Sequence, residues 1–166
     1  MIPIISVVGW SDSGKTTYLE RLIPELVGRG LRICAIKHDV HGFEIDVPGK
    51  DSFRLREAGA ALTVISSPNR IAVIADTTRD LTLVEIRERF ISDVDIIISE
   101  GFKKDIHPKI EVFRRGIRDK LLCTKDDNLI AVASDCPVET AAPVIDLEDV
   151  GTMADFIEGT VLDRER

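Results

Sequence analysis

The stretch Gly9–Thr17, GWSDSGKTT, has the residue types and the spacing of a loop that binds phosphate groups. Gly9, Gly14, Lys15 and Thr16 satisfy the pattern G-x-x-x-x-G-K-[ST], which requires a strand before it and a helix after it. Both flanks are present, because an apolar run precedes the motif and a helical pattern follows it. In such a loop the lysine reaches the β- and γ-phosphates, and the hydroxyl group binds Mg²⁺. The motif therefore predicts a site for a nucleoside triphosphate with magnesium.

Backbone N–H groups at the start of the following helix are expected to point at the phosphates. We expect those of Ser13 to Thr16 to turn inward and form this anion-binding nest. The predicted nucleotide-binding residues of the loop are Gly9, Ser11, Asp12, Ser13, Gly14, Lys15, Thr16 and Thr17.

A carboxylate follows another buried strand of the sequence, DIIISEGF. Glu100 ends this strand, which we expect beside the first one. From there Glu100 would hold a magnesium-bound water or position the attacking water. The residues predicted to lie beside the metal are Thr16 and Glu100. Gly101 would let the next loop approach the γ-phosphate. Asp95, at the opposite end of the strand, is expected to be structural.

The segment Lys37–Arg54 is the most polar loop of the chain and leaves the predicted second strand on the same side. Its cations could bind a second anionic ligand, and its aspartates could assist the metal. The predicted cationic residues here include Lys50 and Arg54. Its H-x-x-H pair lacks a third ligand, so the pattern favours no transition-metal site.

Two aspartates are candidates for reading the base, because a carboxylate accepts from the adjacent N1 and N2 hydrogens of guanine. Asp127 ends a T-K-x-D stretch, TKDD, that resembles the guanine-reading motif of GTPases, although a polar turn explains it equally well. Asp135 follows a buried strand directly, in ASD. We prefer Asp135 slightly, and both remain open.

Short apolar runs alternate with helical patterns along the chain, which predicts an α/β P-loop NTPase fold with a largely parallel, doubly wound sheet flanked by helices. Two runs joined by SPN predict an antiparallel edge hairpin, and a second antiparallel element is expected near Lys109–Arg115. Such strands often pair between subunits, which indicates a homodimer. The strands are predicted at 4–8, 31–36, 62–66, 70–75, 95–99, 110–113 and 129–133, and the helices at 19–27, 51–60, 83–91 and 149–162.

Composition limits the class of protein. The 166 residues, 44% hydrophobic and 31% charged, indicate one globular domain over residues 1–166. A net charge of −7 argues against nucleic acid or an acidic membrane surface as a partner. The three cysteines form no C-x-x-C pair and fit a reducing compartment, so we expect a cytoplasmic protein.

Four stretches together are similar to the molybdopterin-guanine dinucleotide biosynthesis protein B (MobB) family, in order along nearly the whole chain. They are GWSDSGKTT, IKHDVHGFEIDVPGKDSFRLREAGA, SEGFK and IAVASD. The resemblance implies a homodimeric GTP-binding protein with slow intrinsic GTP hydrolysis. It further implies an adapter or nucleotide carrier that assists a MobA-like guanylyltransferase in attaching GMP to molybdenum cofactor, with the molybdopterin as a possible second ligand.

Three groups of residues match the family's sites, and two positions depart from them. The matches are Gly9, Gly14, Lys15, Thr16 and Thr17 for nucleotide, Glu100 and Gly101 on the metal side, and Lys50, Asp51 and Arg54 in the polar loop. The departures are Asp12, where members usually have a small residue, and Asp39, where they have a second histidine. Asp12 adds negative charge to the phosphate loop, which implies weaker nucleotide binding.

Two rival functions are compatible with the motif. A P-loop kinase of a small metabolite could use Arg114–Arg118, RRGIR, as a mobile lid, although no base for a substrate hydroxyl is evident. A pure binding module would hold nucleotide or pterin without chemistry. For a GTPase, we expect a positioned water to attack the γ-phosphate, slowly, because no arginine finger is recognisable within the chain.

Overall fold

The computed structural model describes residues 1–124 and 127–162. Its internal contacts divide the chain into two compact units, the first formed by Met1–His38 with Thr82–Arg166 and the second by Asp39–Leu81. The single-domain interpretation of residues 1–166 stays a prediction.

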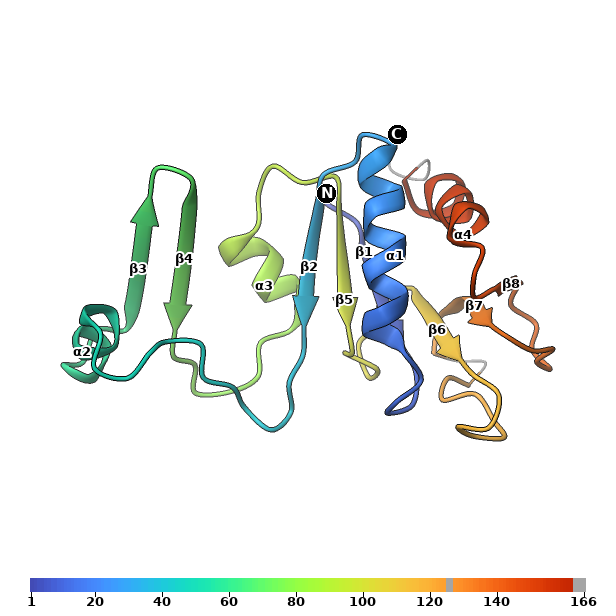
Figure 1. Cartoon of the computed structure of the whole chain (residues 1–166), viewed down its shortest axis with the longest axis horizontal. Helices are drawn as coiled ribbons and strands as arrows, with labels where there is room; N and C mark the ends of the chain where they lie inside the picture. The colour runs from blue at the N-terminus through green and yellow to red at the C-terminus, as the bar shows by residue number, and fades with distance from the viewer. Residues whose placement is uncertain (125–126, 163–166) are drawn as a thin grey trace. The chain divides into compact units, whose positions relative to one another are not determined.

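The first unit is built on a six-stranded sheet with the strand order β2-β5-β1-β6-β7-β8 (Figure 1). Every neighbouring pair is parallel, which confirms the doubly wound sheet. The strands are β1 Ile4–Val8, β2 Ile33–Lys37, β5 Ile96–Glu100, β6 Lys109–Phe113, β7 Leu129–Ser134 and β8 Val144–Asp146. The helices are α1 Lys15–Gly28, α3 Leu83–Phe90 and α4 Val150–Ile157, and the π-helical turn η1 spans Glu158–Leu162.

The antiparallel element expected near Lys109–Arg115 is wrong, because β6 is parallel to both β1 and β7. β6 lies inside the sheet, where Lys109 is 1% exposed and Glu111 is fully buried. Backbone groups satisfy both charges. The Lys109 ammonium donates to the carbonyl of Asp127 at 2.7 Å, and the Glu111 carboxylate accepts from the N–H of Cys123 at 2.8 Å.

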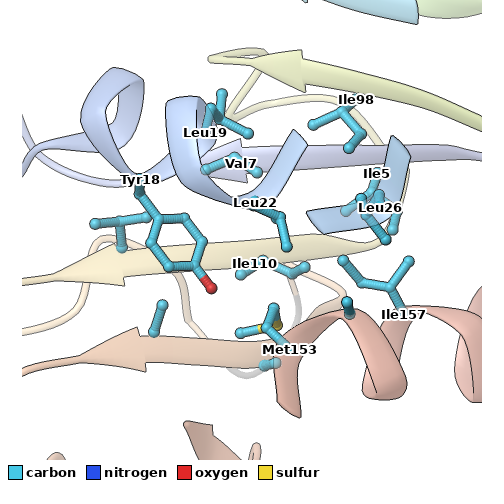
Figure 2. Packing of buried hydrophobic residues seen from close by; sticks show 14 of the residues in the cluster. Ile5, Val7, Tyr18, Leu19, Leu22, Leu26, Ile98, Ile110, Met153 and Ile157 are labelled. Atoms are coloured by element: carbon cyan, nitrogen blue, oxygen red, sulfur yellow. The ribbon is translucent and has the colours of Figure 1, made fainter. Parts of the chain in front are cut away.

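One face of the sheet packs against α1 and α4 (Figure 2). Alternate residues of the strands point to this face, as the two-residue period of a strand requires. Its buried members include Ile5, Val7, Leu22, Leu26, Ile98, Ile110, Met153 and Ile157. The guanidinium of Arg29, just after α1, donates to Asp155 at 2.5 Å and to Glu158 at 2.6 Å, which ties α1 to the C-terminal helical segment.

The other face packs against α3. Ile4 and Ile97, one residue out of phase with the first set, join Leu83 in a second buried cluster. Thr82 begins α3 with a capping box, since its hydroxyl accepts from the N–H of Glu85 and the Glu85 carboxylate accepts from the N–H of Thr82. None of the helices in the described part of the chain is long and apolar enough to cross a membrane.

The second unit contains one helix and one hairpin, α2 Asp51–Glu57, β3 Leu62–Ser67 and β4 Arg70–Ala75. The antiparallel pairing of β3 with β4 confirms the predicted hairpin. Lys50 is the N-cap residue of α2 and makes no side-chain cap bond, and the Ser52 hydroxyl donates to Asp46 at 2.9 Å.

We expect Leu22→Ala to lower the free energy of unfolding by about 3 kcal/mol, because it leaves a cavity between α1 and the sheet. Leu22 has no exposed surface, whereas Val27 on the same helix is 52% exposed. Val27→Ala is the matched control and should change stability by less than about 0.5 kcal/mol. Urea denaturation of both variants measures the difference, and equal losses would contradict this account of the core.

Candidate functional site

Sheet order places the Gly9–Thr17 loop between two strand ends. β1 lies between β5 and β6, with Val7 opposite Glu100 and Val8 opposite Glu111. The chain leaves β1 at the carboxyl edge, where strand order reverses and ligands of doubly wound sheets bind. The predicted position of Glu100, beside the first strand, is confirmed.

The loop backbone requires glycine at its first position. An added Cβ on Gly9 would lie 2.5 Å from the carbonyl oxygen of Val112, and the φ of Gly9 is +149°. Gly14 also has a positive φ, +82°, and so does Asp12, at 65°. Aspartate tolerates this left-handed conformation better than most residues, so the unusual Asp12 fits the loop backbone.

The start of α1 offers unbonded N–H groups. Gly14 is the N-cap residue and no side chain caps the helix. Within residues 1–124 and 127–162, the N–H groups of Gly14, Lys15 and Thr16 donate to no carbonyl group. The expectation for Ser13 is wrong, because its N–H donates to the Trp10 carbonyl at 3.2 Å and closes the turn. The row of unbonded N–H groups therefore begins at Gly14, one residue later than predicted.

Lys15 lies over this turn. Its ammonium donates to the carbonyl groups of Trp10 at 2.8 Å and Gly9 at 3.2 Å. Partial burial lowers the pKa of Lys15 from its ordinary value, while the carboxylates of Glu100 and Asp12 act in the opposite direction. The Lys15 side chain therefore lies at the same turn as the unbonded N–H groups that begin α1.

Thr16 and Glu100 meet, as the metal prediction requires. The Thr16 hydroxyl donates to Glu100 Oε2 at 2.9 Å, and the Lys37 ammonium lies 3.7 Å from Glu100 Oε1. A hydroxyl beside a carboxylate supplies the hard oxygen atoms that Mg²⁺ prefers, directly or through water. The residues present therefore fit a magnesium ion.

The two ends of β5 have different roles. Gly101 has a φ of +100°, and a Cβ there would lie 3.2 Å from the Cβ of His38, so the chain needs glycine where it leaves Glu100. At the other end, Asp95 accepts from the N–H of Arg32 at 2.7 Å. This bond joins the loop before β2 to that before β5, which confirms a structural role for Asp95.

The two candidates for reading the base differ in their contacts. Asp127 accepts from the N–H and hydroxyl groups of Thr124, and both bonds lower its pKa; residues 125–126 of the TKDD stretch lie outside the described part. Asp135 lies at the carboxyl end of β7, on the same edge as the phosphate loop, and accepts from the N–H of Arg115 at 2.9 Å. Base recognition by either residue stays a prediction.

Lys50 and Arg54 belong to the second unit. Arg54 lies 3.7 Å from the carboxylate of Asp51, and both side chains are exposed. Their part in a nucleotide site stays a prediction.

The loop that follows β6 contacts the phosphate loop, whereas the sequence analysis considered its Arg114–Arg118 segment only as a possible kinase lid. The Trp10 indole donates to the carbonyl of Lys120 at 3.0 Å, and the Arg118 guanidinium lies 5.1 Å from the centroid of a Trp10 ring. Arg114 lies against the phosphate loop, since an added Cβ on Gly14 would be 3.2 Å from its Nε. An arginine directly after a predicted strand could have indicated a site residue. That inference for Arg114 also required knowing that β6 lies beside β1.

Comparisons with known proteins agree with this geometry. A model of the family described as molybdopterin guanine dinucleotide synthesis protein B, MobB, matches residues 4–135. A protein of Escherichia coli named molybdopterin-guanine dinucleotide biosynthesis adapter protein is 43% identical over 162 residues, covering 95% of this chain and 92% of its own. One of the same name from Haemophilus influenzae is 37% identical over 158 residues, covering 95% and 88%.

Solved structures show the same fold. A crystal structure of Bacillus subtilis MobB has a TM-score of 0.72 at 28% identity, covering 96% of this chain and 98% of that one. Another MobB crystal structure has a TM-score of 0.70 at 32% identity, covering 94% and 97%. A parallel sheet with the phosphate loop between β1 and α1, shared with these structures, makes this a P-loop NTPase fold. The chain belongs to the MobB family.

Proposed function

We propose that this protein is a GTP·Mg²⁺-binding adapter of molybdenum cofactor maturation, which assists a MobA-like guanylyltransferase in forming molybdopterin guanine dinucleotide. The observation that carries the proposal is the Thr16–Glu100 hydrogen bond beside the free N–H groups of Gly14, Lys15 and Thr16. Relatives covering most of this chain are named as adapter proteins of that biosynthesis.

Phosphate binding and slow hydrolysis follow from the same residues. The N–H groups of residues 14–16 bind the phosphate chain, and Lys15 turns from the loop carbonyls to the β- and γ-phosphates. When bound, Mg²⁺ neutralises charge on the phosphate oxygens beside Thr16. Glu100 accepts a hydrogen bond from the attacking water, which forms a bond to the γ-phosphorus while the bond to the GDP oxygen breaks. The water's proton passes to a phosphate oxygen of the product rather than to a dedicated base, so turnover is slow.

The guanine base of the proposed GTP is assigned to the region between the loops that follow β6 and β7. A cavity of about 590 Å³ between them, within the size range of small-molecule sites, supports a nucleoside there. It is lined in part by Lys120, Cys123, Val138 and Thr140. Asp135, at the base of the second loop, is our preferred reader of guanine.

The kinase alternative is less well supported. A kinase lid must move, but the Arg118 side chain lies over Trp10, and the Trp10 indole is bonded to the carbonyl of Lys120. Product analysis separates the two functions. A kinase yields a phosphorylated metabolite, whereas the proposed adapter releases only inorganic phosphate, slowly, and a binding module releases none.

A homodimer also belongs to this proposal. One face of the β3–β4 hairpin carries four apolar side chains, and each is about half exposed or more. They are Leu62, Val64, Ile71 and Val73. Two copies of such a face would cover each other, as contiguous exposed apolar patches commonly require.

We expect Lys15→Ala to weaken GTP binding about 10- to 100-fold, because a charge-assisted contact contributes about 1.5–3 kcal/mol. Phosphate release should fall with it. Arg89→Ala, which removes an exposed cation at the end of α3, is the control and should bind normally. Calorimetric titration with GTP and ATP, each with Mg²⁺, measures both variants. Equal affinity of the native protein for ATP and GTP would contradict the guanine assignment.

Glu100→Gln is expected to abolish the increase in GTP affinity that magnesium gives. The amide oxygen can still accept from Thr16, so the fold should remain, but the charge that holds the metal is lost. The native protein should bind GTP at least about 10-fold more tightly with Mg²⁺ than with EDTA, a difference of about 1.4 kcal/mol. In the variant the two affinities should agree. Glu88→Gln, on exposed α3 surface, should retain the difference; a metal response that survives in Glu100→Gln would argue against this metal site.

Val73→Lys should convert the dimer to monomer, because it places a charge in the centre of the apolar hairpin face. Val40→Lys is the control, since Val40 is 73% exposed and lies outside the hairpin. Sedimentation velocity of the native protein and both variants measures the mass. A native protein that sediments as a monomer would reject the dimer, and a dimeric Val73→Lys variant would reject this interface.

A further inference from the structure

We propose that Arg114 is a built-in cation of the phosphate site, binding oxygen atoms that GDP and GTP share. The inference rests on the proposed function, since it assigns one more residue to the same nucleotide site. Arg114 is the first residue after β6, the strand beside β1. The sequence analysis placed it only in a possible kinase lid.

The guanidinium lies directly against the phosphate loop. An added Cβ on Gly14 would be 3.2 Å from Arg114 Nε and 3.6 Å from both Cζ and Nη2. Gly14 is the N-cap residue of α1, where the nest of free N–H groups begins. Glycine at this position therefore has a second role besides its backbone angle, because it leaves room for a planar cation beside the nest.

The Arg114 guanidinium has an N–H donor that is not used within the part of the protein that the structure describes. Its Nε is buried and has no hydrogen-bond partner. Within residues 1–124 and 127–162, no acceptor reaches this nitrogen. A buried donor without an acceptor costs about 1–3 kcal/mol, and a bound phosphate oxygen would satisfy it. Guanidinium groups suit phosphate because their parallel N–H groups match two oxygens at once.

The backbone around Arg114 is fixed before any ligand binds. Phe113 is paired with Ser134 of β7, and the Arg115 N–H donates to Asp135. The Arg114 carbonyl accepts from the N–H of Ile117 at 3.3 Å. Since the main chain on both sides is held, ordering it costs little when the nucleotide binds, which favours affinity.

Strand order indicates which phosphate groups Arg114 would bind. Glu100 and the Thr16 hydroxyl, the proposed metal side, lie toward β5 on one side of β1, whereas Arg114 comes from β6 on the other side. A magnesium ion held beside Thr16 and Glu100 would neutralise charge toward the γ-phosphate end of the nucleotide. A cation on the opposite flank is therefore assigned to the diphosphate part, and it should act without magnesium and without a γ-phosphate.

Calorimetric titration of Arg114→Gln with GDP in EDTA and with GTP·Mg²⁺ tests this. Both affinities should fall by a similar factor of about 10 or more. Arg115→Gln is a matched control, because it removes the same charge from the neighbouring exposed residue, and it should change each affinity less than about twofold. Arg114→Lys keeps the charge without the planar fork and should lose less than Arg114→Gln.

Three results would overturn the proposal while the native protein binds GTP: unchanged GDP affinity in Arg114→Gln, a loss confined to GTP, or equal losses in the Arg115→Gln control. Thermal melting without ligand identifies a purely structural role. If Arg114→Gln melts lower yet its folded fraction binds GDP normally, the guanidinium only supports the loop. A native protein that binds neither nucleotide would instead reject the proposed function itself.

Discussion

The close approach of Gly9 to the end of β6 is the constraint on which the site depends. With the Val112 carbonyl 2.5 Å from where a Cβ would lie, only glycine lets β1 turn at this point. The turn then closes through the bond from the Ser13 N–H to the Trp10 carbonyl, and α1 begins at once with uncapped N–H groups. The anion-binding surface is thus a consequence of how tightly the loop backbone packs on the neighbouring strand.

An acidic protein must concentrate positive charge locally to bind a polyanion. Lys15 and Arg114 do so here in different ways. Lys15 is held by two carbonyl groups of its own loop and has a flexible stem, so it can turn toward a ligand. The buried Nε of Arg114 has no acceptor in the described part of the chain, and the guanidinium is already beside Gly14. The carboxylate of Glu100 occupies the other side, where a divalent cation would make its charge favourable.

The sequence predicted the features that depend on local pattern. The phosphate motif, the Glu100 strand end, the hairpin and the alternation of helices with strands all follow from residue type and spacing within short segments. It did not predict the contacts of β6, because Lys109 and Glu111 look like solvent-facing residues in an alternating pattern. β8 was missed because three residues, Val144–Asp146, carry too little periodicity. Arg114 was missed as a site residue because its position depends on strand order, which no short segment encodes.

The buried charges of β6 explain why the loop after it can serve as a fixed wall of the site. Burial raises the pKa of Glu111, while the N–H groups of Leu122 and Cys123 act against that shift and favour the carboxylate. On the same strand, the Lys109 ammonium holds the carbonyls of His107 and Asp127. An apolar side chain in either place would pack well but would leave these backbone groups without partners, at a cost of about 1–3 kcal/mol each. With Trp10 bonded to the Lys120 carbonyl as well, the described part of this loop is held from both β6 and the phosphate loop. In the proposed site such a wall would orient a nucleotide without closing over it, as the proposed transfer of the nucleotide to a partner protein requires.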